Sequence, residues 1–191
     1  MPDEHKMLVW LNEIQQYRLP RWEELPDIEL YMDQVITLIE RYLTPLVGEH
    51  DSKVITPAMI NNYVKLNIMP KPIKKRYERT HLAYLIVITI LKQVILITEV
   101  KEGIFLQSKL CSIPEAYNIF CDMQEKALSE MAEIYTSAYA QKQPQPFERV
   151  ALDSMGLYMA CTSFAGKIFT EKIIFTRHED RAAILPSEDE E

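Results

Sequence analysis

Glycine is scarce in this chain, and its scarcity constrains the fold more than any other feature. The 191 residues include four glycines, which leaves little material for the hairpin turns of a sheet or for loops that cradle phosphates. Leu, Met, Glu and Lys are plentiful, and these residues favour helices. The sequence therefore predicts an all-α protein, to which a short β-ribbon is the most that can be added.

Positive charge is concentrated in one stretch of an acidic chain. Residues 53–92 hold eight Lys and Arg residues against one acid, Glu78, and carry +7 in a protein whose formal net charge is −7. The other residues therefore carry −14. Such a local excess of cations favours contact with a polyanion, most simply a nucleic-acid backbone. The alternative is a solvated basic surface.

Compartment is indicated by what the sequence lacks. The acidic N-terminus has neither the basic start nor the apolar run of a signal peptide. The three cysteines, Cys111, Cys121 and Cys161, form no close pair, which favours free thiols in a reducing compartment. Residues 82–91 are almost entirely apolar but are too few to cross a bilayer. We expect a cytoplasmic protein without membrane contact.

Apolar spacing divides the first part of the chain. Residues 1–26 are expected to form an N-terminal helix and a Pro-bounded loop, and a second domain is expected over residues 27–110. Its first helix is predicted over about 27–43, followed by a loop from Pro45 to Lys53. Thr56 before Pro57 is typical of a helix start, so a further helix is predicted over residues 56–66.

The segment after this helix cannot be helix interior, because it contains two prolines within a dense basic cluster. We expect a short ribbon or wing over residues 69–79. Apolar helices are predicted after it, over about 80–95 and 99–104.

The C-terminal part, residues 111–175, is expected to form a helical hairpin for dimerisation or effector binding. Ser112 with Glu115 predicts a capping box for a helix over about 114–140. A break and a last helix over about 147–175 follow. Residues 176–191 are expected to form an acidic tail.

The helix predicted over residues 56–66 has two different faces. One is apolar, with Met59, Ile60, Tyr63 and Val64, and the opposite one carries Ala58, Asn61, Asn62 and Lys65. Asparagine is a poor residue for a helix interior, so two in succession need a reason. An Asn amide can bind the N6 and N7 edge of adenine in the major groove. The alternative is that both side chains are simply solvated.

This region resembles MerR-type winged helix-turn-helix regulators. The run MINNYVKLNIMPKP, residues 59–72, is similar to the recognition helix and turn of that family. In this resemblance Asn61, Asn62 and Tyr63 take the places of Arg-Tyr-Tyr, and Asn67 takes that of a glycine at the helix end. Two departures stand out: the Arg is replaced by Asn61, and the usual N-G-Y-R turn of the wing is replaced by KKRY without glycine.

A closer resemblance is to an uncharacterised bacterial family, the domain of unknown function family eighteen thirty-six. It is carried by LPxWxELPDIxLYMDQ at residues 19–34, ITPxMINNYVK at residues 55–65 and KKxYxxxHLAxLIxIxxLKQV at residues 74–94. The resemblance implies a helix-turn-helix-like fold similar to that of MerR regulators and states no function.

Together these features predict a sequence-specific transcriptional regulator that reads double-stranded DNA with helix 56–66 and a basic wing at residues 69–79. The candidate DNA-binding residues are Thr56, Ala58, Asn61, Asn62, Lys65, Lys71, Lys74, Lys75, Arg76, Tyr77 and Arg79. The alternative is a helical protein-interaction module whose winged-helix fold no longer binds DNA.

A homodimer built from the C-terminal helices is expected, because helix-turn-helix readers usually bind two symmetric half-sites. A small apolar effector is a further candidate partner, with a pocket lined by Met155, Tyr158, Met159 and Phe164. No metal-ligand spacing, cofactor motif or catalytic motif occurs in the sequence. We therefore expect no cofactor and no enzymatic activity.

Overall fold

The computed structural model describes residues 12–47, 54–139 and 163. Its elements are η1 (Trp22–Glu24), α2 (Met32–Val47), α3 (Pro57–Lys65), α4 (Arg79–Leu91), α5 (Ile97–Ser108) and α6 (Ile113–Tyr139). Residues 12–16 are also helical. In these ranges β-structure is limited to two isolated antiparallel bridges, so the predicted all-α class is confirmed.

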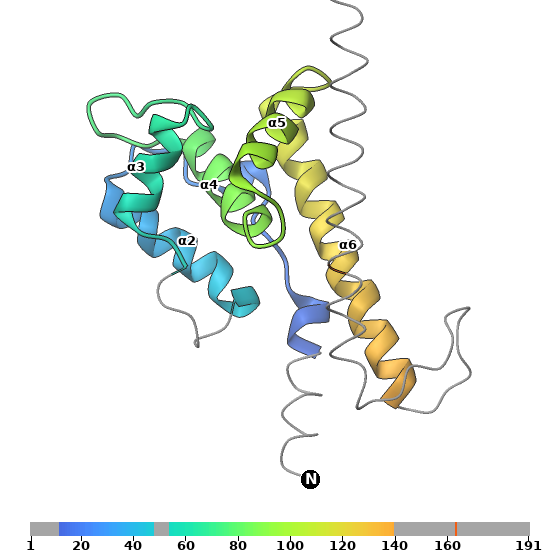
Figure 1. The fold of residues 1–191 in the computed structure, drawn as a ribbon. Helices are drawn as coiled ribbons and strands as arrows, with labels where there is room; N and C mark the ends of the chain where they lie inside the picture. Colours follow the sequence, from blue (N-terminus) through green and yellow to red (C-terminus); the bar gives the residue numbers. More distant parts are fainter. Residues whose placement is uncertain (1–11, 48–53, 140–162, 164–191) are drawn as a thin grey trace, which may run out of the picture.

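Helix α4 lies at the centre of the fold. It packs against α2 on one side and against α5 and α6 on the other (Figure 1). Its sequence is apolar around most of its circumference, and Leu82, Leu85, Ile86 and Ile88 are fully buried. Such a helix is stable only as the core of a larger assembly of helices. The position of α4 therefore sets α2 and α3 apart from α5 and α6.

Helix α2 differs from its prediction at both ends. It begins at Met32 rather than near residue 27, because Leu30 pairs with Tyr77 through two backbone hydrogen bonds of 2.8 and 2.9 Å. Ile28 consequently lies outside the helix and is exposed. The predicted start of the following loop at Pro45 is also wrong, since Pro45 lies inside the last turn, while residues 48–53 of that loop lie outside the described residues. Near the end of a helix a proline removes only one hydrogen bond of a ladder that is about to stop.

Helix α3 begins and ends as its sequence predicts. Thr56 is the N-cap and its Oγ1 accepts a hydrogen bond from the Met59 amide at 3.2 Å. At the C-terminus Asn67 adopts a left-handed conformation with φ 54°. The amides of Asn67 and Ile68 donate to the carbonyls of Val64 and Tyr63, the paired bonds of a Schellman motif. This ending turns the chain sharply into the segment that follows.

Residues 68–78, called here the basic loop, connect α3 to α4. The predicted ribbon is reduced to one bridge, Ile73 with Arg76, which closes a turn at Lys74 and Lys75. A second bridge, between Leu30 and Tyr77, joins the end of the loop to the chain that precedes α2. The loop is therefore held at its base and protrudes beside α3 (Figure 1).

The remaining helices follow the prediction with shifted bounds. Helix α4 ends at Leu91 rather than near residue 95, and α5 is longer than the predicted 99–104. Helix α6 agrees with the predicted 114–140 to within one residue. At its start the Glu115 carboxylate accepts hydrogen bonds from the Ser112 amide and hydroxyl at 2.9 and 2.6 Å. The helix predicted over 147–175 and the acidic tail lie outside the described residues.

Residues 17–25, called here the N-terminal clasp, fix α6 to the rest of the fold. The Arg21 guanidinium donates to both carboxylate oxygens of Glu125, at 2.6 and 2.9 Å. The Tyr117 hydroxyl donates to the Pro20 carbonyl at 2.8 Å, and the Trp22 amide donates to Asn118 Oδ1 at 2.9 Å. These bonds span about a hundred positions of sequence, so the LPRW motif joins the two ends of the described fold.

Candidate nucleic-acid interface

The outer face of α3 is polar and open to solvent. Ile60 and Tyr63 point into the core, and Met59 and Val64 are half-buried. The side chains predicted to lie opposite are all exposed: Ala58, Asn61, Asn62 and Lys65. The two-faced pattern is therefore confirmed at the level of burial. An exposed helix with adjacent amides and a lysine is the kind of surface that can enter a DNA groove.

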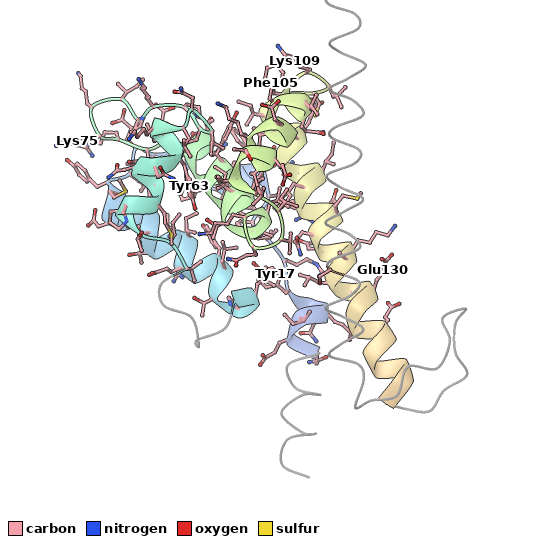
Figure 2. All side chains as sticks on the ribbon, viewed as in Figure 1. Tyr17, Tyr63, Lys75, Phe105, Lys109 and Glu130 are labelled. Atoms are coloured by element: carbon pink, nitrogen blue, oxygen red, sulfur yellow. The ribbon has the colours of Figure 1, made fainter. Side chains whose placement is uncertain are left out.

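The basic loop adds three exposed lysines beside this face: Lys71, Lys74 and Lys75. Together with Lys65 they have no acidic partner within salt-bridge distance among the described residues. Lys75 lies on the opposite side of the molecule from Glu130 of α6 (Figure 2). We call α3 residues 58, 61, 62 and 65 with loop residues 71, 74 and 75 the basic face. Its unpaired cations are available to bind phosphate groups.

The turn at the tip of the loop is under backbone strain. Lys74 and Lys75 have φ of 50° and 62°, so two consecutive residues with a Cβ occupy the left-handed region. Turns with positive φ at both central residues strongly prefer Asn-Gly, because glycine has no side chain to clash. The chain keeps two lysines here at a conformational cost. Strain of this kind is often found where side-chain identity matters for binding.

Arg76 is stacked on an aromatic ring. Its guanidinium carbon lies 3.7 Å from the centroid of the Tyr31 ring, a favourable arrangement for a cation. Tyr31 is half-exposed and reaches this position because Leu30, its neighbour, pairs with Tyr77. Tyr31 lies within the LYMDQ motif, but nothing in the sequence indicates this contact with a residue 45 positions away. The stack on Tyr31 restricts the rotation of the Arg76 guanidinium group.

Tyr77 and Arg79 face inward. The Tyr77 ring is buried and meets the His81 ring edge to face at 5.5 Å. Arg79 is half-buried, donates to the Leu25 carbonyl at 3.1 Å and lies 3.7 Å from the Asp27 carboxylate. The Arg79 side chain therefore connects α4 to the segment that precedes α2, and the Tyr77 ring packs against α4. The structure does not bring them to the basic face.

Lys92 is also set apart from the other cations of the basic stretch. Its Nζ lies 3.5 Å from the Met59 sulfur and 5.9 Å from the centre of the Tyr63 ring. Burial lowers the pKa of Lys92 below its usual value. Lys92 thus packs on the inner side of α3. The basic stretch of the sequence separates in space into a solvent-facing group and a group that holds helices together.

His81 connects the basic loop to α4. Its Nδ1 accepts a hydrogen bond from the Glu78 amide at 3.0 Å, so the neutral ring carries its proton on Nε2. Nε2 has no hydrogen bond among the described residues, although the Lys71 carbonyl is close enough to favour the protonated form. Burial dominates and lowers the His81 pKa. The neutral ring therefore binds the Glu78 amide before the first turn of α4 and packs against Tyr77 at the end of the basic loop.

The other predicted site residues lie either at the start of α3 or outside the described residues. Thr56 is half-buried as the α3 cap. The four residues of the predicted effector pocket, Met155, Tyr158, Met159 and Phe164, lie outside the described residues. Within the described ranges no His, Cys, Asp and Glu side chains gather in a group of three that could hold a metal ion. None of the helices described is both long and apolar enough to span a bilayer.

Comparison with known proteins gives one match. The model of a family described as "Domain of unknown function (DUF1836)" matches residues 20–120, just over half of the 191-residue chain. The match runs from the N-terminal clasp to the first turns of α6 and includes the whole basic face. No curated protein and no solved structure matches the chain.

Proposed function

The chain belongs to the family of the domain of unknown function DUF1836, and because that membership names no activity, we propose from the geometry that it is a DNA-binding transcriptional regulator. Helix α3 reads the major groove of double-stranded DNA, and the basic loop binds the adjacent backbone in the manner of a wing. The order of a capped helix, a tight loop and a second helix supports a MerR-like arrangement. The domain acts in the cytoplasm, without catalysis.

One observation carries the proposal: exposed amides adjoin exposed lysines on α3 and the basic loop, and these lysines form no ion pair with any acid in the part of the chain that the structure describes. Asn61 and Asn62 lie on the solvent side of a helix whose opposite side is buried in the core. Lys, Glu or Gln would solvate the same surface with a higher helix propensity than two consecutive asparagines have. An Asn side chain on the solvent side of a helix can form two hydrogen bonds with the edge of a base in the major groove, and this use explains its presence there.

The division between the cations also supports nucleic acid. Lysines that serve packing are withdrawn into the protein, as Lys92 is, whereas Lys71, Lys74 and Lys75 remain outside. Phosphate contacts of this type position a protein on the duplex without reading sequence. The adjoining Asn pair then supplies the sequence reading. A homodimer formed through residues beyond Pro114 would present two such faces to symmetric half-sites.

Selection of bound duplexes from a random DNA library, using the full-length chain, tests the proposal. We expect enrichment of a defined motif, symmetric if the chain dimerises, and loss of binding as salt concentration rises. The matched charge controls are Lys74→Ala on the basic loop and Lys126→Ala on α6, because both side chains are exposed and both changes remove one positive charge. Only the first should weaken DNA binding.

The result would also decide between the proposal and a protein-interaction module. If no duplex binds at low salt, the basic face does not serve DNA. If duplexes bind but Lys74→Ala and Lys126→Ala weaken binding equally, the interaction is a general charge effect rather than a property of this face.

A further inference from the structure

An apolar groove lies on the other side of the molecule from the basic face, between α4, α5 and α6. Its volume is about 300 Å³, and residues such as Val87, Ile104, Phe120 and Met123 line it. Along its α6 margin Ile113, Ile119 and Met123 are exposed to 37, 46 and 60%. A run of exposed apolar side chains beside an apolar groove indicates a surface that is covered in the functional protein.

The same chain contains a segment with a matching apolar face. Residues 147–175 have many apolar side chains spaced for a helix, and one stripe contains Leu157, Cys161, Phe164, Ile168 and Phe175, with the charged Glu171 and Lys172 between the last two. Ser163 is the single residue of this segment that the structure describes, and it is helical and exposed. On a helix Ser163 projects well away from that stripe.

The distance along α6 from the groove to Tyr139 can be compared with the distance from residue 147 to the apolar stripe. Ile113 and Met123 precede Tyr139 by 26 and 16 residues, which corresponds to about 39 and 24 Å along the helix axis. Residues 141–146 (QKQPQP) contain two prolines and separate α6 from the next helical pattern. A helix that returned antiparallel from residue 147 would put about residue 163 opposite Met123 and about residue 173 opposite Ile113.

We infer that the groove between α4, α5 and α6 is the docking site for residues 157–175 of the same chain. Attachment through a short connection gives this segment an effective concentration in the millimolar range. A second copy of the chain, present at micromolar concentration, competes poorly against it. Docking covers Met123 and Ile119 and packs the Phe164 side chain against Phe120. This inference is independent of whether the basic face binds DNA.

Photocrosslinking of the full-length chain tests the inference. A benzophenone amino acid replaces Met123, and unlabelled and ¹⁵N-labelled chains are mixed before irradiation. We expect crosslinked peptides that join position 123 to residues near 164 and carry a single isotope label. The same amino acid at Thr37, an exposed position of α2, is the control and should give no crosslink to residues 157–175.

Other outcomes contradict the inference. Crosslinks of mixed isotope composition would show that a second copy occupies the groove, and a lack of crosslinks between position 123 and residues 157–175 would show that the segment is elsewhere. A pair of substitutions gives a second readout. Phe164→Asp should lower the Tm and increase the fluorescence of an apolar dye, whereas Thr37→Asp, at an exposed position of α2, should change neither. Equal behaviour of the two variants would also overturn the inference.

Discussion

Arg21 and Glu125 form a two-pronged ion pair between segments that are 104 residues apart in sequence. The two guanidinium nitrogens bind the two carboxylate oxygens at 2.6 and 2.9 Å, and the Leu19 amide donates to the same carboxylate at 2.9 Å. Burial alone would raise the Glu125 pKa, but the hydrogen bonds from Arg21 and Leu19 hold it below its usual value. The pair is the strongest polar link between the N-terminal clasp and α6.

Glu125→Gln should therefore lower the free energy of unfolding by about 2 kcal/mol, because it removes the more buried of the two carboxylates that pair with Arg21 and leaves only the exposed Asp122. Chemical denaturation at neutral pH measures this change. Glu130→Gln is the matched control, since Glu130 lies on the same helix in an exposed pair with Lys126, and should cost less than about 0.5 kcal/mol. A cost for Glu125→Gln no larger than that of the control would show that the clasp does not depend on this pair.

His81 predicts a loss of stability in mild acid. Its pKa is lowered by burial in the folded chain, so the unfolded chain binds more protons once the pH falls below the ordinary His pKa of about 6.5. The neutral His81 ring therefore contributes fully to stability above about pH 6.5. This contribution is lost as the pH falls from that value towards the lower pKa of the folded chain. His81→Asn keeps an acceptor for the Glu78 amide and does not titrate. Between pH 7 and 5 its unfolding free energy should fall less than that of the parent chain, and parallel curves would contradict this role of His81.

The strained turn at Lys74 and Lys75 predicts opposite effects on stability and binding. Replacing the pair by Asn-Gly supplies the residues that a turn with two positive φ values prefers. The double variant Lys74→Asn, Lys75→Gly should be more stable by about 1 kcal/mol. It should also bind DNA more weakly, because two phosphate-binding cations are gone. Thermal unfolding and salt-dependent binding measure the two effects. If the double variant neither gained stability nor bound DNA more weakly, the strain could not be explained by a role of these two lysines in DNA binding.

Much of α3 and α6 could be predicted because local residues determine where they begin and end. Thr56 before Pro57 caps α3, Asn67 ends it in the left-handed conformation, and Glu115 binds the Ser112 amide at the start of α6. Each of these signals involves partners no more than three or four positions apart. Local chemistry of this kind can be recognised in a sequence without knowledge of the fold.

Features that depend on distant partners could not be predicted. The stretch before α2 is extended because Leu30 pairs with Tyr77, 47 positions later. Arg79 has the same charge as Lys71, yet it turns inward because the Leu25 carbonyl and the Asp27 carboxylate lie within reach. Counting charges along the sequence therefore overestimates the number of cations on the basic face. Only the tertiary structure separates cations that can meet a ligand from cations that hold the fold together.

Asn61 or Asn62 and the exposed lysines should affect DNA binding in different ways. Alanine at the asparagine that reads adenine should cost about 1–3 kcal/mol on the selected site and relax discrimination at one base pair, with nonspecific binding nearly unchanged. Alanine at Lys71, Lys74 or Lys75 should weaken binding to every duplex alike and lower the salt slope by about one unit for each phosphate that the side chain no longer neutralises. Binding isotherms on selected and scrambled duplexes at several salt concentrations measure both.

The side chains that the structure turns inward provide the control for this experiment. Arg79→Lys keeps the charge but removes the paired interactions of the guanidinium with Leu25 and Asp27. It should therefore lower stability while leaving the salt slope of DNA binding unchanged, because Arg79 does not reach the basic face. If Arg79→Lys changed the salt slope as much as Lys74→Ala does, the assignment of Arg79 to the interior would be wrong. If the asparagine variants weakened all sequences equally while the lysine variants had no effect, α3 would not be the element that reads the groove.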